Sequence, residues 1–187
     1  MKHLPPIFVV TGAPAVGKST FCTELMQRFD LGFHVPVDNL RDWVVSGIAN
    51  PLNWCDETSR QFKLAELAAA DVARRYNDAG FAVAIDHCQE LPVLDELILE
   101  SLPGRKVIRI ALTCDLEVNL QRNRDRTNKT FDHQILVATI ENLNPKYREP
   151  EKVDAQWNTI ENHPNRLYEA IDRAIELADG PLGQRSL

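Results

Sequence analysis

The stretch Gly12-Ala13-Pro14-Ala15-Val16-Gly17-Lys18-Ser19 follows an apolar run, Ile7 to Thr11. Its spacing matches the phosphate-binding loop G-x-x-x-x-G-K-[ST], in which backbone N–H groups surround a polyphosphate. Gly12 would make the tight turn after a strand, and Gly17 would let the chain pass close under the phosphates. Apolar residues at helical spacing after the lysine supply the helix that the motif requires, so we favour a nucleotide site over a simple glycine-containing turn.

Each part of this motif has an expected role in binding ATP. The Lys18 ammonium should reach the β- and γ-phosphates, and the Ser19 hydroxyl should bind Mg²⁺. The helix that opens near Lys18 adds its positive N-terminal end. The residues expected to bind the nucleotide are Gly12, Ala13, Ala15, Val16, Gly17, Lys18, Ser19 and Thr20.

The length and charge of the chain limit what it can be. Its 187 residues predict one domain over residues 1–180 and a tail at 181–187. The net charge of −6 disfavours a surface that coats nucleic acid or a polybasic membrane contact. The four cysteines are scattered, which indicates neither a zinc site nor a disulfide framework. We expect a cytoplasmic protein, because the apolar N-terminal run is too short to span a membrane; the sequence does not indicate an oligomeric state.

Strand and helix patterns alternate along the chain. The expected strands are residues 7–11, 32–37, 81–85, 106–113 and 153–160. The expected helices are residues 18–29, 39–46, 57–79, 91–102, 115–126, 134–143 and a last one that opens at Pro164. Asn144-Pro145 should interrupt the helix before it. This alternation predicts an α/β fold with three layers, in which a parallel sheet lies between helices.

Two acidic residues follow expected strands close to the phosphate loop. Asp38 comes after the second strand, and Arg41 lies one helical turn further on. These two side chains match a catalytic base and an acceptor-positioning arginine, although Asp38 could instead cap a helix, with Arg41 as its ion-pair partner. Asp86 ends the third strand, where a carboxylate for Mg²⁺ is expected, with a turn-capping role as the alternative.

A basic cluster in the second half of the chain suggests a lid over residues 122–133. Arg122 and Arg126 are four residues apart and would share a helix face, which is suited to stabilising a transferring phosphoryl group. Solvated surface arginines are the alternative. Among the tryptophans, we expect Trp43 and Trp157 to pack in the core and Trp54 to be a substrate-contact candidate in its loop.

Taken together, these segments resemble the P-loop kinases of the polynucleotide 5′-kinase, chloramphenicol phosphotransferase and gluconate kinase type. The similarity covers the chain through about residue 143. It implies a sheet of five parallel strands in the order 2-3-1-4-5. It also implies that the Asp-x-x-Arg of Asp38 and Arg41 supplies base and acceptor contact, and that Arg122 and Arg126 hold phosphates from a small helical lid.

The expected function is therefore transfer of the γ-phosphoryl group of ATP, with Mg²⁺, to a hydroxyl group. Polynucleotide kinases usually follow this Asp with Thr-Asn or a similar pair, whereas His87-Cys88 follow Asp86 here, which leaves the identity of the acceptor open. A small-molecule or nucleoside-like acceptor is favoured over nucleic acid because the net charge is −6 and few cations are left over for a nucleic-acid strand. Two alternatives stay open, a 5′-hydroxyl polynucleotide kinase and a nucleotide-hydrolysing switch protein. The expected catalytic residues are Lys18, Asp38, Arg41, Arg122 and Arg126, and the expected metal ligands are Ser19 and Asp86.

Overall fold

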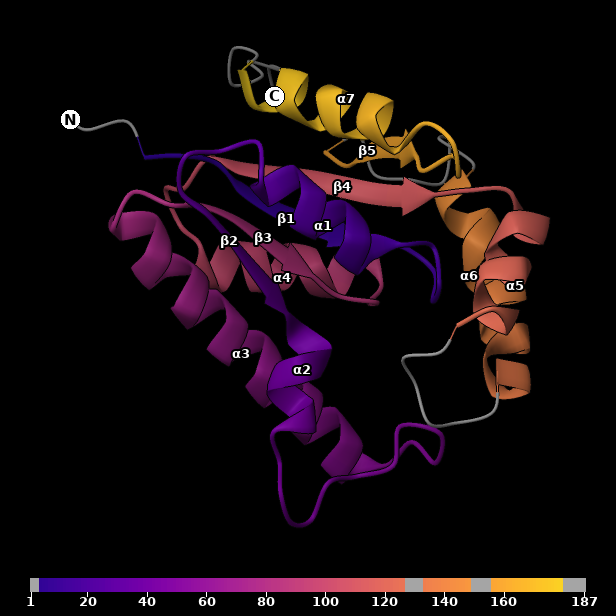
Figure 1. The fold of residues 1–187 in the computed structure, drawn as a ribbon. Coiled ribbons are helices and arrows are strands. Elements are labelled where there is room, and N and C mark those ends of the chain that lie inside the picture. Colours follow the sequence, from indigo (N-terminus) through magenta and orange to yellow (C-terminus); the bar gives the residue numbers. More distant parts are fainter. Residues whose placement is uncertain (1–3, 127–132, 149–155, 180–187) are drawn as a thin grey trace.

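The computed structural model describes residues 4–126, 133–148 and 156–179 (Figure 1). Its centre is a sheet of five parallel strands: β1 Ile7–Thr11, β2 Gly32–Pro36, β3 Ala82–Asp86, β4 Val107–Thr113 and β5 Asn158–Glu161. Their spatial order is β2-β3-β1-β4-β5. The parallel sheet and its order 2-3-1-4-5 are thus confirmed, and the carboxyl ends of all five strands face the same side of the molecule.

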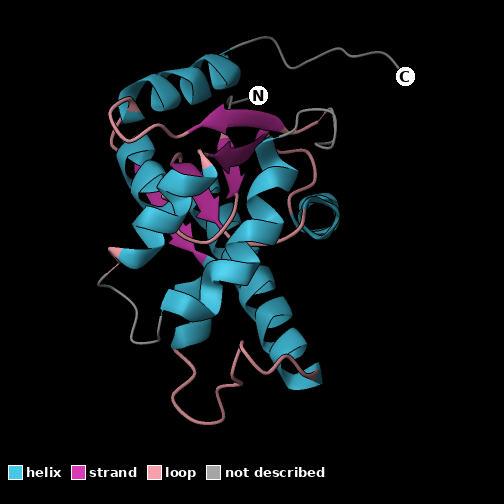
Figure 2. Cartoon of the chain, turned by 90° about the vertical axis from the view of Figure 1, so that its right-hand side faces the viewer, coloured by secondary structure: helices cyan, strands magenta, loops and turns pink. Residues whose placement is uncertain are grey.

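Helices cover both faces of this sheet (Figure 2). They are α1 Lys18–Met26, α2 Val37–Asp42, α3 Asp56–Asp78, α4 Leu91–Ser101, α5 Leu116–Arg124, the 3₁₀ helix η1 His133–Leu136, α6 Val137–Arg148 and α7 Leu167–Asp179. Helices α3 and α4 pack on one face, and α1 and α7 pack on the other. The α5–α6 pair stands at the end of β4, next to the start of α1 (Figure 1).

The central strand β1 shows why the layers form. Each of its five residues is buried, because its side chains alternate between two cores. Ile7 and Val9 pack with the alanine-rich face of α3, whereas Phe8 and Val10 pack with α1 and α7. A strand covered on both faces has to be apolar throughout, which is the pattern seen in the sequence.

Several expected boundaries were wrong. Helix α6 does not stop at Asn144 but runs through Pro145 to Arg148. A proline inside a helix costs about 3 kcal/mol, and buried contacts offset this cost, because Asn144 and Tyr147 are both almost fully buried on α6. The last helix begins at Leu167 and not at Pro164. The expected last strand begins at residue 158, and residues 153–155 lie outside the described part of the chain.

The loop between α2 and α3 contains a further correction. Helix α2 ends at Asp42, earlier than expected, so that Trp43 is its C-cap residue and is 73% exposed. The prediction that Trp43 packs in the core is therefore wrong, whereas Trp157 is 5% exposed and does pack there. No helix in the described part of the chain is long and apolar enough to cross a membrane.

Candidate active site

The phosphate loop joins β1 to α1, as the motif requires. Gly12 and Gly17 have φ angles of 148° and 98°, in the region that side chains disfavour, and a Cβ at Gly12 would overlap the carbonyl oxygen of Leu112. Ala15 also has a positive φ of 61°, an outlier that helps to turn successive N–H groups inward. Gly17 is the N-cap of α1 and offers no capping side chain, which leaves the first N–H groups of the helix for a ligand.

Lys18 lies over this loop. Its ammonium donates hydrogen bonds to the carbonyls of Gly12 and Ala13 at 2.9 and 3.1 Å, and the residue is 9% exposed. The charge is therefore held above the concave side of the loop, where the β- and γ-phosphates of a nucleotide are expected.

Side chains from distant parts of the sequence support the loop from outside. The Asn162 amide donates to the carbonyl of Val16 at 2.8 Å, and Asn119 donates to the carbonyl of Pro14 at 2.7 Å. A Cβ on Gly17 would lie 2.5 Å from Nδ2 of Asn162, so this residue needs to be glycine both for its φ and for its neighbour. We did not predict the asparagines; the only signal in the sequence is that Asn162 follows a strand at its carboxyl end.

Arg122 also contacts the loop. Its guanidinium donates to the carbonyls of Val16 and Asn162 at 2.8 and 3.1 Å. Arg126 lies beyond the C-cap of α5, Asp125, so the expectation that both arginines share a helix face is wrong. Half of the expected lid, residues 127–132, lies outside the described residues.

Asp86 lies at the end of β3, beside Ser19 and Lys18. Burial acts to raise the pKa of this carboxyl, but the hydrogen bond and charge of His34, the charge of Lys18 and a hydrogen bond from Ser19 outweigh burial and hold the pKa below 3.8. The His34 ring nitrogen Nε2 is 2.8 Å from Oδ2 of Asp86. A buried, ionised carboxylate next to a hydroxyl is a donor set that fits Mg²⁺. The role of His34 was missed, because nothing in a local sequence pattern links it to Asp86.

Asp38 lies in the first turn of α2, and the structure does not support the capping alternative. The N-cap of α2 is Pro36, which makes no side-chain capping bond, and the ion pairs found among the described residues do not include one between Asp38 and Arg41. Arg41 is instead buried, donates to the carbonyl of Ala49 and lies 4.6 Å above the centre of the Phe62 ring. Its Nε has no hydrogen-bond partner.

Four of the expected site residues lie near enough to the Cys88 thiol to influence its pKa. Burial raises its pKa, and four surrounding charges act on it, with Lys18 and Arg126 lowering the pKa and Asp38 and Asp86 raising it. The P-loop lysine, the proposed base, the proposed metal ligand and an arginine of the basic cluster therefore lie within electrostatic reach of one point.

An aromatic wall stands next to Arg41. The Trp54 ring is 59% exposed and stacks on Phe62, with 5.2 Å between ring centres. On another side of Phe62, His87 is buried and its Nε2 lies 3.0 Å from Oε1 of Glu66. Nδ1 of His87, like Nε of Arg41, is buried without a partner, so two polar atoms around one ring are left unsatisfied.

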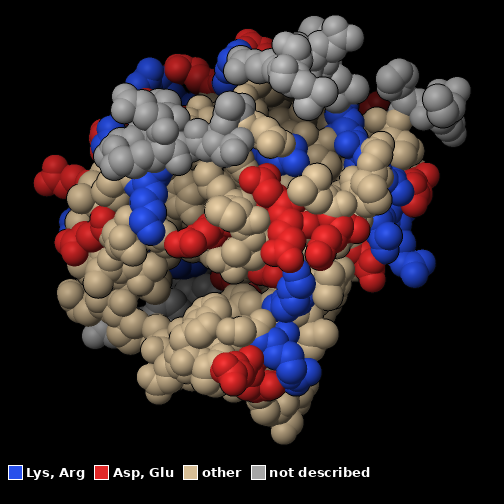
Figure 3. All heavy atoms as spheres, turned by 180° about the vertical axis from the view of Figure 1, so that it is seen from behind, with Lys and Arg blue, Asp and Glu red and all other residues tan. Residues whose placement is uncertain are grey.

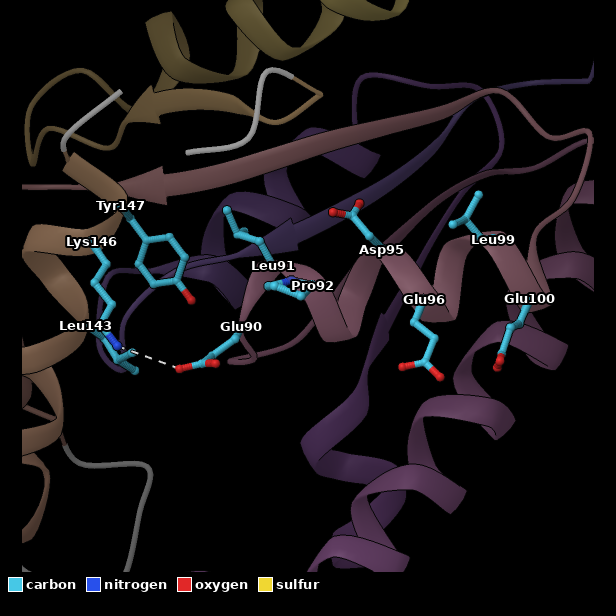
Figure 4. A pocket seen from close by; sticks show the side chains of 10 residues that line it. All are labelled: Glu90, Leu91, Pro92, Asp95, Glu96, Leu99, Glu100, Leu143, Lys146 and Tyr147. Carbon is cyan, nitrogen blue, oxygen red and sulfur yellow. Dashed lines mark ion pairs between the residues drawn. The ribbon is translucent and has the colours of Figure 1, made fainter. Parts of the chain in front are cut away.

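A hollow of about 890 Å³ lies between α4 and α6, and no residue of the phosphate loop lines it (Figure 4). Acidic side chains gather on this back face of the molecule (Figure 3). Those that line the hollow are Glu90, Asp95, Glu96 and Glu100. Lys146 is also at its edge, 3.6 Å from Glu90. Carboxylates in this number would repel a polyphosphate, which makes this hollow unsuited to a nucleotide.

Comparisons with known proteins agree with this geometry. The chain is similar in structure to a gluconokinase from Sinorhizobium meliloti 1021, with 17% identity, a TM-score of 0.59 and 95% and 96% of the two chains covered. It is also similar to the Deinococcus radiodurans tunicamycin resistance protein, with 17% identity, a TM-score of 0.65 and coverage of 95% and 97%. A shikimate kinase from Bacteroides thetaiotaomicron is similar too, with 14% identity, a TM-score of 0.62 and coverage of 93% of this chain and 98% of the kinase. No curated protein sequence matches the chain. The AAA domain family AAA_18 matches residues 8–154, and the chain therefore belongs to this family of P-loop proteins and has the fold of a P-loop kinase.

Proposed function

We propose that this protein is a kinase that transfers the γ-phosphoryl group of ATP to a hydroxyl group of a small-molecule or nucleoside-like acceptor in the cytoplasm. The observation that carries the proposal is the geometry of the phosphate loop, in which Lys18 lies over the carbonyls of Gly12 and Ala13 while Asp86 ends the neighbouring strand β3. Asp38 and Arg126 are near the same region, because their charges, like those of Lys18 and Asp86, act on the Cys88 thiol. A switch protein needs the phosphate-binding part of this arrangement. Only a transferase also needs a carboxylate that accepts the proton of the acceptor hydroxyl, and Asp38, in the first turn of α2, is the candidate for this role.

The chain supplies the parts of an in-line transfer. Asp38 accepts the proton of the acceptor hydroxyl, whose oxygen then bonds to the γ-phosphorus while the bond to the β,γ-bridging oxygen breaks and ADP leaves. Lys18, Arg122 and Arg126 stabilise the charge on the phosphoryl oxygens during this step. Arg122 is already oriented by two backbone carbonyls, so little reorganisation is required of it.

Ser19 and Asp86 are the residues that would hold Mg²⁺, directly or through water. When bound, this ion would neutralise negative charge on the phosphates of the nucleotide. Asp86 is suited to this role because its lowered pKa keeps it ionised at neutral pH.

The acceptor would bind between Asp38 and the aromatic wall of Phe62 and Trp54. Arg41 and His87, each with a buried polar atom that has no partner, lie around the Phe62 ring, and the exposed face of Trp54 offers an apolar surface. The names of two structural neighbours, gluconokinase and shikimate kinase, refer to small acceptors, which supports the same class here.

A polynucleotide acceptor has less support. A strand of nucleic acid needs several unpaired cations along one track, but near this wall Arg60 is paired with Glu57 and Lys63 lies 3.8 Å from Glu100. The net charge of −6 also disfavours a nucleic-acid acceptor.

The test is a screen of hydroxyl compounds and 5′-hydroxyl oligonucleotides with γ-labelled ATP. Label should move into a small acceptor in wild-type protein and not in the Lys18→Ala variant. Label that appears at an oligonucleotide 5′ end would favour the polynucleotide kinase. Release of phosphate that no acceptor changes would favour the nucleotide-hydrolysing switch.

A further inference from the structure

Three side chains with metal-binding atoms meet beneath the active site. Sγ of Cys22 on α1, a ring nitrogen of His34 on β2 and a carboxylate oxygen of Asp86 on β3 all lie within 4.8 Å of one another. Cys22 and Asp86 are buried and His34 is partly buried. The three residues come from separate elements, so only the fold unites them.

The spacing is close to what a tetrahedral metal ion needs. With metal–nitrogen and metal–oxygen bonds of about 2.0 Å and a metal–sulfur bond of about 2.3 Å, neighbouring ligand atoms lie roughly 3.3 to 3.5 Å apart. The 2.8 Å distance between His34 and Asp86 would lengthen slightly on binding. The distances from Sγ of Cys22 to the other two ligand atoms, which are at most 4.8 Å, would need to shorten by up to about an ångström, and small side-chain rotations can supply this change.

The His34 ring has the second contact that metal-binding histidines use. Its Nδ1 lies 3.2 Å from Oγ1 of Thr23, while Nε2 points at Asp86. When a metal displaces the proton of Nε2, Nδ1–H remains to donate to the threonine hydroxyl, and the lone pair of Nε2 is directed toward the cluster. A hydrogen bond of this kind fixes both the tautomer and the ring orientation.

The charges of the three ligands also match that of a divalent ion. On binding, the Cys22 thiol and Nε2–H of His34, which donates to Asp86 in the unbound protein, each lose a proton to solvent as the metal–sulfur and metal–nitrogen bonds form; His34 then binds as a neutral ring and Asp86 as a carboxylate. One thiolate and one carboxylate neutralise a divalent ion, which makes its burial possible. A sulfur and a nitrogen ligand favour zinc and disfavour Mg²⁺, which prefers oxygen.

We propose that Cys22, His34 and Asp86 form a binding site for a zinc-type transition-metal ion, with a fourth position open to water. Because Asp86 is shared, an ion in this site removes a ligand from Mg²⁺ and inhibits the enzyme. The inhibition rests on the proposed kinase function, whereas binding of the ion does not.

Binding is tested with Co²⁺ as a spectroscopic probe, on metal-free protein without nucleotide. A variant with Cys55→Ser, Cys88→Ser and Cys114→Ser retains Cys22 as its only thiol. We expect it to bind one equivalent of Co²⁺ with a thiolate-to-cobalt charge-transfer band, and to lose this band when Cys22→Ser is added. Absence of the band in the triple variant, or its persistence without Cys22, would overturn the proposal.

Three further variants keep the test decisive if Cys22→Ser fails to fold. His34→Asn should weaken Zn²⁺ binding at least tenfold in calorimetry. Thr23→Val, at an exposed position, should weaken it by about ten- to a hundredfold, and Thr23→Ser should retain it. Unchanged affinity in both His34→Asn and Thr23→Val would refute the site. In kinase assays Zn²⁺ should raise the Mg²⁺ requirement of wild-type protein, and binding without this effect would refute the shared use of Asp86.

Discussion

Replacement of Gly17 by alanine separates two reasons why the phosphate loop needs glycine. Gly17 has a φ of 98°, and a Cβ there would lie 2.5 Å from the Asn162 amide nitrogen. Gly104 has a φ of 70° in an exposed turn, and a Cβ there would have no neighbour within 4 Å. Gly104→Ala is therefore the matched control, since it carries the backbone strain without the steric overlap.

The expected magnitudes follow from these contacts. The left-handed conformation costs an alanine about 1–2 kcal/mol, and the lower entropy of the unfolded chain returns roughly 0.4–1 kcal/mol of that. Gly104→Ala should thus lower the free energy of unfolding by about 1 kcal/mol or less. In Gly17→Ala the buried Asn162 side chain must also leave the Val16 carbonyl, at about 1–3 kcal/mol, for a total of roughly 2–4 kcal/mol.

Urea unfolding measures the stability of both variants, and calorimetric titration with ATP measures their binding. Gly104→Ala should bind ATP as wild-type protein does, and Gly17→Ala should bind at least tenfold more weakly, because its loop no longer lies against Asn162. Equal losses of stability in the two variants, with unchanged ATP affinity in both, would refute the reasoning.

Four further predictions concern the site. Asp38→Asn should lower turnover by roughly a hundredfold or more, through loss of the base, and change stability by less than about 1 kcal/mol, since Asp38 caps no helix; normal turnover in kinetic assays would exclude the base. Arg122→Ala should reduce turnover more than ATP affinity, and equal losses would indicate simple clamping of the nucleotide. The ionised form of Asp86 should stabilise the fold above pH 3.8 and cease to do so as pH falls through its lowered pKa; urea unfolding across this range should show wild-type protein losing stability relative to Asp86→Asn, and a constant difference would contradict this. Single-stranded oligonucleotides should bind weakly in anisotropy titrations, and tight binding with a steep salt dependence would contradict the small-acceptor choice.

Local patterns in the sequence were sufficient for the strands, most helices and the phosphate loop. Such patterns succeed where a structure depends on neighbouring residues, as in the alternation of Ile7 to Thr11 or the spacing from Gly12 to Lys18. The same approach failed at Trp43 and Pro145. Whether Trp43 reaches the core depends on where α2 ends, and whether Pro145 breaks α6 depends on what the rest of the helix buries.

The sequence by itself determined that a phosphate loop joins a buried strand to a helix, because its glycines and lysine act through the backbone that carries them. Only the tertiary structure decided what surrounds that loop. Asn162 reaches Val16 across 146 positions of sequence, and it does so because β5 ends beside the loop. His34 meets Asp86 because β2 pairs with β3 in a register that aligns Pro36 with Asp86. Strand order and register arise from how all the layers pack together, so no local spacing in the chain reveals these contacts.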